Sequence, residues 1–281
     1  MPISFAFNGD DVVWTQRFDR PAVYLDTFAI RAIAESDERS ARFAHGLKAR
    51  NGTWLLAAVS MGEFARFADP RHTERAERLL AQVVPHVYLF LSEPSDARVK
   101  RGETNPARQS LPPADRRNMD YFSRKWAQTQ SFPETFQGMF QVVHENRDRM
   151  VETLDEVTSK LVASLVQHRQ MKSYRRKAKA AQPDDGRTRQ QIISGELLRE
   201  LVLDTKASVT ANEVIDLMHA VDAVDYCDLV LLDKAWERRV NALHQRIAET
   251  GIDMPIARCL SMRNGGIDRF LEAIEQWPTA A

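Results

Sequence analysis

Residues 214–236 read VIDLMHAVDAVDYCDLVLLDKAW and join an apolar helical pattern to a short apolar run, with acids spread through both. The aspartates are Asp216, Asp222, Asp225, Asp228 and Asp233. Charged side chains are rarely buried without partners, and neighbouring carboxylates repel one another. A buried helix and strand of this kind therefore need a positive partner, and a metal ion is the first candidate.

Short apolar runs alternate with helix-like stretches on both sides of this segment. The runs lie at 22–25 (AVYL), 53–58 (TWLLAA), 86–91 (HVYLFL), 229–232 (LVLL) and 255–261 (PIARCLS). Strands that alternate with helices are typical of a parallel sheet. The sequence thus predicts an α/β fold in which a small parallel sheet is flanked by helices in three layers, α/β/α.

The chain has 281 residues, of which 43% are hydrophobic and 28% charged, the balance of a globular protein with one large domain or a domain plus an insertion. Its cysteines, Cys227 and Cys259, cannot build a disulfide framework. No apolar run is long enough for a membrane helix, and the first residues lack a signal-peptide pattern. We therefore expect a cytoplasmic protein without a membrane partner.

The composition changes in the middle of the chain. After a polar, proline-punctuated stretch begins at residue 92, residues 97–190 hold 19 Lys and Arg against 11 Asp and Glu, although the whole chain has no net charge. We interpret 1–95 and 191–281 as the α/β core and 96–190 as a helical, basic insertion. Apolar residues at three- and four-residue steps predict one long amphipathic helix in it, through Val143, Met150, Leu154, Val157, Leu161 and Leu165.

The apolar stripe of this helix needs a cover. The core, another helix of the insertion and a second protomer of a homodimer all meet that need. The sequence leaves the three possibilities open.

The C-terminal end of the predicted long helix is rich in cations. The segment holds Tyr174 and the basic residues Arg169, Lys172, Arg175, Arg176, Lys177 and Lys179. Such a cluster binds phosphates in a sequence-blind, salt-dependent way, and a tyrosine ring stacks on a base. A solvated helix end, where cations complement the helix dipole, accounts for the same residues. Nucleic-acid binding and a solvated end both stay open here.

Two acids directly follow apolar runs. Asp26 comes after AVYL and Asp233 after LVLL, and a helix-like stretch follows each of them. The carboxyl ends of parallel strands form the ligand crevice of an open sheet. An aspartate in this position also caps the next helix, which is a purely structural role. Because two strands repeat the arrangement, we interpret both acids as candidate site residues.

Glu63 follows the second predicted strand, within the segment SMGEF. Ser60 and Glu63 have the spacing of a helix capping box, and this structural explanation is the simpler one for the segment by itself. The position nevertheless brings Glu63 to the same edge of the sheet as the two aspartates. We therefore include it among the candidate site residues.

Asp216 lies at the flank of the apolar arc of its helix, in line with small residues, so close packing brings it to the sheet. Asp222 and Asp225 point away from that arc, and we expect them to be solvated. Asp228 opens the next strand and either joins the site or ends the helix. His219 has no second His or Cys at zinc-ligand spacing, so a supporting or surface role is favoured over ligation.

Several carboxylates tolerate one another when a divalent cation lies between them. Two bare carboxylates about 4 Å apart repel by roughly 4 kcal/mol at an effective dielectric constant of about 20. An all-oxygen ligand set suits Mg²⁺ or Mn²⁺. Such an ion polarises a phosphoryl oxygen and lowers the pKa of a bound water. The implied chemistry is phosphodiester hydrolysis.

The segments VYLDTFAI, SMGEF and DLMHAVDAVDYCDLVLLDKAW resemble, in order and spacing, the acidic segments of PIN-domain proteins, which include toxin-type ribonucleases. The resemblance covers the two core segments and not the insertion. It implies a nuclease, an endoribonuclease that cleaves single-stranded RNA with Mg²⁺ or Mn²⁺. It also leaves an inhibitor protein open as a partner. Carried onto this sequence, it implies the metal ligands Asp26, Glu63, Asp216 and Asp233, with Asp228 as an extra member.

The chain departs from the family pattern at two places. A polar residue expected shortly after the first Asp is replaced around Phe28, and the Thr or Ser expected before the last Asp is replaced by Leu231 and Leu232. These changes weaken the expected surroundings of the ligands. The alternative function is a PIN-like module that has lost catalysis and binds RNA or protein. A haloacid-dehalogenase-type phosphohydrolase fails, because its second Asp would stand at Phe28.

Overall fold

The computed structural model describes residues 2–92, 109–183, 186–206 and 208–278. The predicted boundary between core and insertion, at residues 95 and 96, lies outside the described part. Within that part, no helix is both long enough and apolar enough to cross a bilayer.

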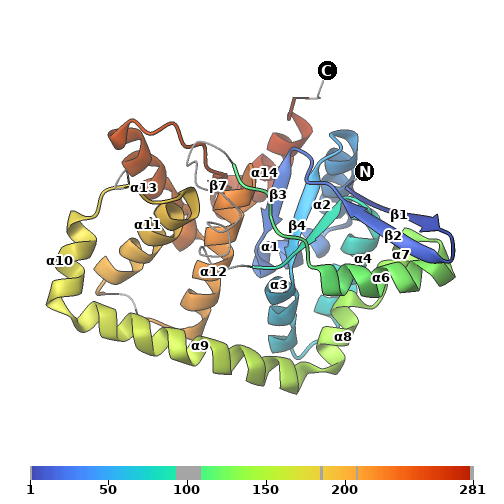
Figure 1. Cartoon of the computed structure of the whole chain (residues 1–281), viewed down its shortest axis with the longest axis horizontal. Helices are drawn as coiled ribbons and strands as arrows, with labels where there is room; N and C mark the ends of the chain where they lie inside the picture. The colour runs from blue at the N-terminus through green and yellow to red at the C-terminus, as the bar shows by residue number, and fades with distance from the viewer. Residues whose placement is uncertain (1, 93–108, 184–185, 207, 279–281) are drawn as a thin grey trace.

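The core is a parallel sheet of five strands, which confirms the predicted α/β class (Figure 1). All four strand pairs are parallel, and the order across the sheet is β5-β4-β3-β6-β7. Each strand lies within one of the predicted apolar runs. The strands are β3 (Ala22–Leu25), β4 (Thr53–Ala57), β5 (Val87–Phe90), β6 (Leu229–Leu231) and β7 (Arg258–Leu260).

Successive side chains of each strand point to opposite faces, and both faces are buried. On β3, Val23 and Leu25 belong to one apolar cluster, whereas Ala22 and Tyr24 belong to another. A strand buried on both faces needs an unbroken apolar run, as AVYL is. This double burial explains why the runs are so clear in the sequence.

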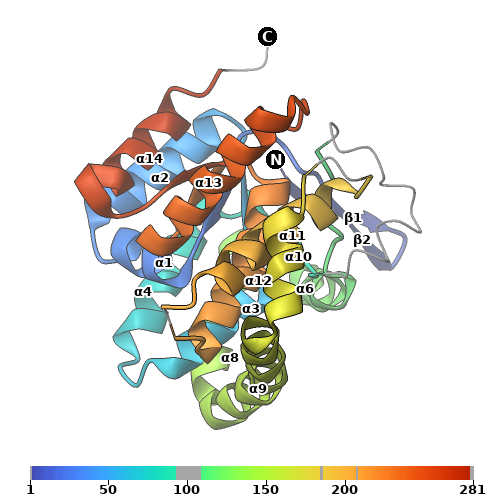
Figure 2. The ribbon, with the colours of Figure 1, turned by 90° about the vertical axis from the view of Figure 1, so that its left-hand side faces the viewer.

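Two groups of helices cover the sheet and complete the three layers. The first group packs on the face of Val23, and Figure 2 shows two of its members, α2 and α14, side by side. It contains α1 (Thr27–Ala34), α2 (Asp37–Ala49), α4 (Arg71–Val83) and α14 (Gly266–Glu275). The second group packs on the face of Tyr24 and contains α11 (Arg189–Leu203), α12 (Ala211–Tyr226) and α13 (Lys234–Thr250).

Short helical turns join some of these elements. Two of them carry β4 onward to α4, and the third precedes α14. They are α3 (Ala58–Gly62), η1 (Glu63–Arg66) and η2 (Arg263–Gly265).

The predicted insertion is helical, and its first helices add to the core on the α1 side of the sheet. Its elements are α6 (Arg116–Thr129), α7 (Phe132–Phe136), α8 (Met139–Glu145), α9 (Arg147–Gln170) and α10 (Lys172–Ala180). The single long helix predicted from 143 onward is wrong, because the helix breaks at Asn146 and again at Met171. Figure 1 shows α9 as a long rod that runs from α8 to α10.

The apolar stripe of α9 is only partly covered. Leu165 is buried, and Met150 and Leu154 are half-buried. Val157 is 49% exposed and Leu161 42% exposed. The core therefore covers the two ends of the stripe and leaves its middle open.

A hairpin at the N-terminus was not predicted. It pairs β1 (Ile3–Asn8) with β2 (Asp11–Gln16) in an antiparallel register that opposes Asn8 to Asp11. Gly9 has a positive φ of 65° in the two-residue turn, as tight hairpin turns require. In the sequence, the alternation of ISFAF and the Gly-Asp pair that follows it indicate this hairpin. The indication is weak because the apolar run is short and half polar.

The aspartates expected to be solvated on α12 are buried. Asp225 is 0% exposed and pairs with Arg189, which is 2% exposed, at 2.5 Å. Asp222 is 4% exposed, and Ser92 Oγ donates to its Oδ2 at 2.6 Å. The solvent prediction is wrong because α11 and the chain after β5 cover the sides of α12 that the apolar arc leaves free.

We expect Asp225→Ala to lower the free energy of unfolding by about 3 kcal/mol, because it removes the carboxylate that pairs with the buried guanidinium of Arg189. Urea unfolding measures the change. Glu156→Ala, which breaks the exposed pair of Glu156 with Lys160, is the control and should cost well under about 1 kcal/mol. Equal losses in the two variants would contradict a structural role for the buried pair.

Candidate metal centre

The order of the strands reverses between β3 and β6. Counted along the chain, β3 is the first strand of the sheet and its neighbours are the second, β4, and the fourth, β6. Ligands of open parallel sheets bind beyond the carboxyl ends of the strands at such a reversal. Asp26 directly follows β3, and Asp233 follows β6 by two residues. Both acids therefore lie where this rule places a ligand.

Asp26 and Asp233 also cap helices, so both roles considered for them in the sequence coexist. Asp26 Oδ1 accepts the backbone N–H of Thr27 at 2.7 Å and begins α1. Asp233 Oδ1 accepts the backbone N–H of Trp236 at 2.8 Å and begins α13. Each cap uses one carboxylate oxygen and holds the side chain in place, while Oδ2 is not needed for the cap.

The capping box expected at Ser60 and Glu63 does not form. Ser60 Oγ instead lies 2.9 Å from the hydroxyl of Tyr24, on β3, and Glu63 is the first residue of η1. Glu63 Oε2 accepts a short hydrogen bond from the hydroxyl of Thr27. These two hydrogen bonds tie the segment of Glu63 to β3 and α1, and they turn its carboxylate toward the strand edge.

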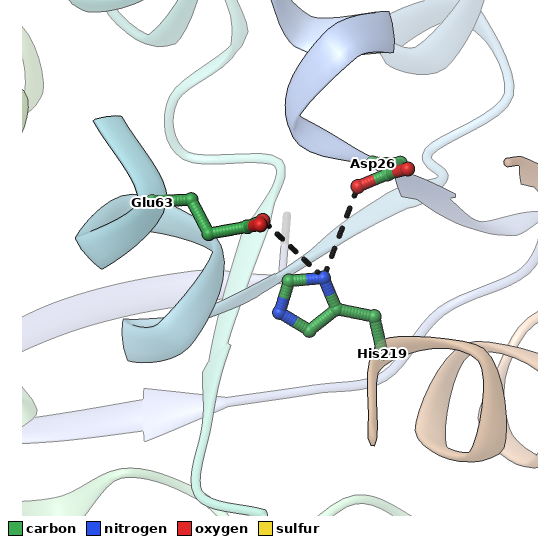
Figure 3. A group of neighbouring side chains, drawn as sticks. All are labelled: Asp26, Glu63 and His219. Atoms are coloured by element: carbon green, nitrogen blue, oxygen red, sulfur yellow. Dashed lines mark ion pairs between the residues drawn. The ribbon is translucent and has the colours of Figure 1, made fainter. Parts of the chain in front are cut away.

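Figure 3 shows three side chains that meet at this edge: Asp26, Glu63 and His219. His219 Nδ1 lies 3.5 Å from Glu63 Oε2 and 3.8 Å from Asp26 Oδ1. One ligand atom from each of the three residues lies within 4.8 Å of the other two. The arrangement offers two carboxylates and one imidazole to a single ion.

His219 was not predicted as a site residue. A surface role is wrong, because the side chain is only 4% exposed. The missed signal is its spacing from Asp216, since residues three apart lie on the same face of a helix.

Asp216 lies in the electrostatic field of the other three predicted ligands. Burial, together with the negative charges of Asp26, Glu63 and Asp233, raises the pKa of Asp216 to about 8. The charge of His219 opposes the rise. The structure therefore brings Asp26 and Glu63 within reach of one ion together with His219. Asp216 and Asp233 lie near enough for their charges to interact with this group.

The pKa values of Glu63 and His219 are displaced as well. Burial raises the pKa of the Glu63 carboxyl, and the charge of His219 and the Thr27 hydroxyl oppose the rise in part. For His219, burial by itself lowers the pKa, but the surrounding carboxylates outweigh it and raise the pKa. Without a further cation, the cluster holds protons that isolated groups would lose.

Asp228 does not belong to this cluster, and its assignment as an extra metal ligand is wrong. It precedes β6, so it lies at the amino end of the strand whose carboxyl end leads to Asp233. Its Oδ2 accepts the backbone N–H of Ala22 at 2.7 Å and lies 3.0 Å from Arg20 Nη1. A strand rises by about 3.3 Å per residue, so the length of β6 separates Asp228 from the site.

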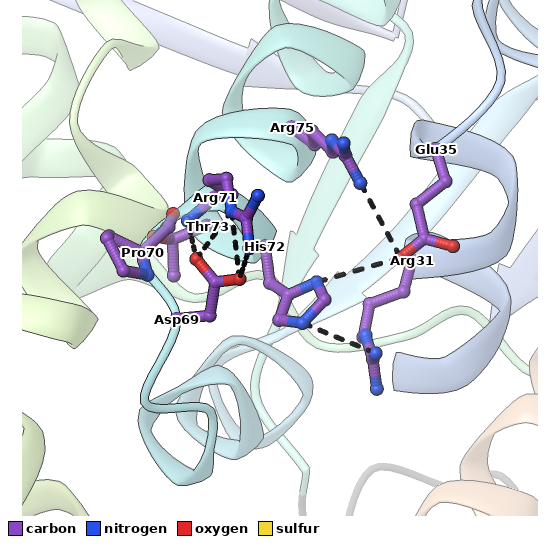
Figure 4. A network of polar contacts seen from close by, with 8 residues as sticks. All are labelled: Arg31, Glu35, Asp69, Pro70, Arg71, His72, Thr73 and Arg75. Atoms are coloured by element: carbon purple, nitrogen blue, oxygen red, sulfur yellow. Dashed lines mark hydrogen bonds and ion pairs between the residues drawn. The ribbon is translucent and has the colours of Figure 1, made fainter.

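A polar network braces the helices around the site (Figure 4). Arg31 Nη2 of α1 lies 3.4 Å from His72 Nε2 of α4, and His72 Nδ1 lies 3.7 Å from Glu35. Arg75 contacts the same carboxylate of Glu35 at 3.8 Å. The network joins the helix that begins at Asp26 to the helix that follows η1, so it helps to hold Asp26 and Glu63 at a constant separation.

The residues at which the sequence departs from the PIN-domain pattern lie in apolar surroundings in the fold. Phe28 is half-buried against the core on the α1 side of the sheet. Leu231 is 0% exposed and Leu232 2% exposed. None of them brings a polar group to the candidate ligands.

The cations of α10 line a separate surface pocket of about 500 Å³, whose basic residues are Lys172, Arg175, Arg176 and Lys179. Lys177 is exposed beside them. Arg169 is half-buried, and its Nε donates to the carbonyl of Leu201 at 2.8 Å. Tyr174 stacks on His168 with ring centroids 4.1 Å apart, so one face of its ring is already covered. Four of the seven predicted nucleic-acid residues thus share one pocket.

The basic pocket and the acidic cluster lie along the same helix, α9. Asp155 of α9 contacts Arg66, three residues beyond Glu63, at 3.3 Å. From Asp155 to the end of α9 at Gln170 the helix extends roughly 23 Å, at 1.5 Å per residue. The cations of α10 therefore do not surround the carboxylates, and a ligand that reaches both must be long.

Comparison of the chain with protein-family models, curated proteins and solved structures found no match. The site is therefore interpreted from its own geometry.

We expect Asp216→Asn to change how the stability of the metal-free protein depends on pH. The pKa of Asp216 is about 8 in the folded protein against an ordinary 3.8, so the folded chain holds a proton that the unfolded chain loses between these values. Wild type therefore loses stability as the pH rises from about 4 to 8. The advantage in stability of the variant over wild type should therefore grow between pH 5 and pH 9.

Urea unfolding in the presence of a chelator, at pH 5 and pH 9, measures this difference. At pH 9 the gain should exceed about 1.4 kcal/mol, the value of one pKa unit. Asp253→Asn, at an exposed aspartate before β7, is the matched control and should leave the profile unchanged. Parallel profiles for Asp216→Asn and wild type would show that Asp216 is not held protonated.

Proposed function

We propose that this protein is a divalent-metal-dependent nuclease that hydrolyses phosphodiester bonds of single-stranded RNA. One observation carries the proposal. Asp26 and Glu63, from separate segments of the chain, meet at His219 beyond the carboxyl end of β3, and their charges and that of Asp233 act on the nearby Asp216. A fold gains no stability from such repulsion, so the arrangement supports a role in binding a cation.

The charge balance of the cluster supports a further positive group. The carboxylates of Asp26, Glu63 and Asp216 act on the imidazole of His219, and Asp233 adds its negative charge at Asp216. Even if the imidazole is protonated, the fully ionised cluster keeps an excess of negative charge. A divalent cation would remove the conflict and allow Asp216 to ionise near neutral pH. Oxygen-rich sites of this kind suit ions that also bind a substrate phosphate.

The residues divide into two roles in the reaction. Asp26 and Glu63 would hold the ion, since their oxygens are held toward one point by the cap at Thr27 and by the Thr27 hydroxyl. Asp216 and Asp233 would orient the attacking water and accept its proton. A bound divalent ion supplies charge for the phosphoryl oxygens and acidifies water. The water oxygen bonds to phosphorus, the bond from phosphorus to the leaving oxygen breaks, and that oxygen takes up a proton.

RNA is the proposed substrate because of the resemblance to PIN-domain ribonucleases and because of the pocket on α10. Within the described residues, no carboxylate forms an ion pair with Lys172, Arg175, Arg176 or Lys179. Cations without acid partners are suited to phosphates. A single strand cut at the acidic cluster would extend along α9 and reach these cations several nucleotides away.

The runner-up function is a module that binds RNA without cutting it. The apolar side chains of Phe28, Leu231 and Leu232 favour it, because polar groups that would orient the ligands are missing there. A cleavage assay decides between the two functions.

Asp26→Asn and Asp233→Asn should each reduce cleavage of single-stranded RNA with Mn²⁺ by about 100-fold or more. Asparagine preserves the helix caps, so the variants remove charge and keep the fold. Digestion of a labelled oligonucleotide over time, with thermal unfolding of each variant alongside, measures the effect. Asp253→Asn is the matched control at the opposite edge of the sheet.

Cleavage by wild type that survives in both site variants would exclude the acidic cluster as its source. Binding of RNA by wild type without any cleavage would favour the binding module. Metal-dependent cleavage that Asp253→Asn retains and the site variants lose would support the nuclease.

The triple variant Lys172→Ala, Arg176→Ala, Lys179→Ala should bind single-stranded RNA more weakly and with a weaker dependence on salt. Removing one cation that neutralises a phosphate reduces the slope of log K against log salt by roughly 0.7, so the expected change is about 2 for three cations. Fluorescence anisotropy with an inactive Asp26→Asn background measures both quantities.

The control for this experiment is a triple variant of exposed cations elsewhere, Lys48→Ala, Arg78→Ala, Arg263→Ala. Because it removes the same net charge, a general electrostatic effect would appear in both triple variants. An unchanged slope in the α10 variant would mean that the pocket is a solvated helix end.

A further inference from the structure

His219 is a buried polar side chain whose ring nitrogens have no hydrogen-bond partner among the described residues. It is 4% exposed, and buried polar groups nearly always have a partner. Its Nδ1 is nevertheless aimed at two carboxylates, as Figure 3 shows. A group of this kind indicates that something belongs between the nitrogen and the oxygens.

The distances around His219 fit an ion better than a direct hydrogen bond. Nδ1 lies 3.5 Å from Glu63 Oε2 and 3.8 Å from Asp26 Oδ1. Hydrogen bonds from nitrogen to oxygen measure about 2.7 to 3.2 Å, so both separations are too long. Two ligands that each lie about 2.0 to 2.2 Å from one ion are roughly 3 Å apart when adjacent and about 4.4 Å apart when opposite. Both measured separations fall within that range.

The neighbours of the ring keep Nδ1 in this position. The ring of Tyr24 lies against that of His219, with centroids 5.9 Å apart. The Tyr24 hydroxyl in turn contacts Ser60 Oγ at 2.9 Å. The tyrosine is therefore held at both ends of its side chain, and it limits the rotation of the imidazole that faces Asp26 and Glu63.

We propose that His219 is a metal ligand through Nδ1, together with Asp26 and Glu63, and that this nitrogen makes the centre prefer a transition-metal ion such as Mn²⁺ over Mg²⁺. The inference rests on the metal centre of the proposed function and names the class of ion that it takes. Imidazole suits first-row transition ions, whereas Mg²⁺ takes oxygen ligands and keeps its waters. A site of four carboxylates without the imidazole would not favour a transition-metal ion over Mg²⁺ in this way.

Electron spin echo envelope modulation of Mn²⁺ bound to the whole protein tests the ligand directly. The chain is first freed of metal with a chelator, and Mn²⁺ is then added below one equivalent. The expected spectrum shows modulation from a directly bound ¹⁴N nucleus. In protein labelled with ¹⁵N-histidine that modulation should give way to the ¹⁵N pattern. This measurement needs no substitution, so it stays decisive if a variant of the buried residue fails to fold.

Variants then assign the nitrogen to one residue. His219→Gln should lose the modulation and weaken Mn²⁺ binding by about tenfold or more in calorimetric titration, with a smaller change for Mg²⁺. His219→Asp, which makes the ligand set all oxygen, should reduce the preference for Mn²⁺ over Mg²⁺. His45→Gln, at an exposed histidine of α2, is the matched control and should change neither quantity.

The outcomes separate this inference from the proposed nuclease. Mn²⁺ binding without nitrogen modulation would overturn the role of His219, even if RNA cleavage persists. Nitrogen modulation that His219→Gln abolishes would support the role, even if no RNA is cut. Failure of the wild-type protein to bind Mn²⁺ would overturn both the ligand and the metal centre.

Discussion

The crowding of negative charge beyond β3 and β6 is the constraint on which this structure depends. Asp26 and Asp233 reach that place because parallel strands end at the same edge, and Asp216 reaches it because α12 packs across the sheet. Burial, together with the repulsion that results, raises the pKa of Asp216 to about 8. A cation at this place would convert a destabilising cluster into a binding site.

The rest of the fold holds the cluster in place rather than relieving it. The helix caps hold Asp26 and Asp233, and the Thr27 hydroxyl holds Glu63. The polar network between α1 and α4 and the buried pair of Arg189 with Asp225 brace the surrounding helices. Preorganised ligands of this kind bind an ion without a large rearrangement, which is the physical basis for proposing a metal centre and a metal-dependent reaction.

The sequence predicts the position of a carboxylate that follows a strand more directly than that of any other acid. Asp26 and Asp233 were predicted from position alone, because a parallel strand has only one carboxyl end. Asp228 was misplaced, because an acid that opens a strand and one that follows it look alike in a short apolar segment. His219 was missed and Asp225 was thought solvated, because neighbouring segments of the chain decide what covers each side of a helix.

The sequence by itself determined the parallel sheet and the order of its strands along the chain, because strands buried on both faces require unbroken apolar runs. It also determined that acids would follow two of these strands. Only the tertiary structure decided which side chains share the site, since η1 meets α1 and α12, and α3 meets β3, through contacts between residues far apart in the chain. The tertiary structure also separates the basic pocket of α10 from the acidic cluster by much of the length of α9, because α9 runs past the cluster and does not fold back upon it.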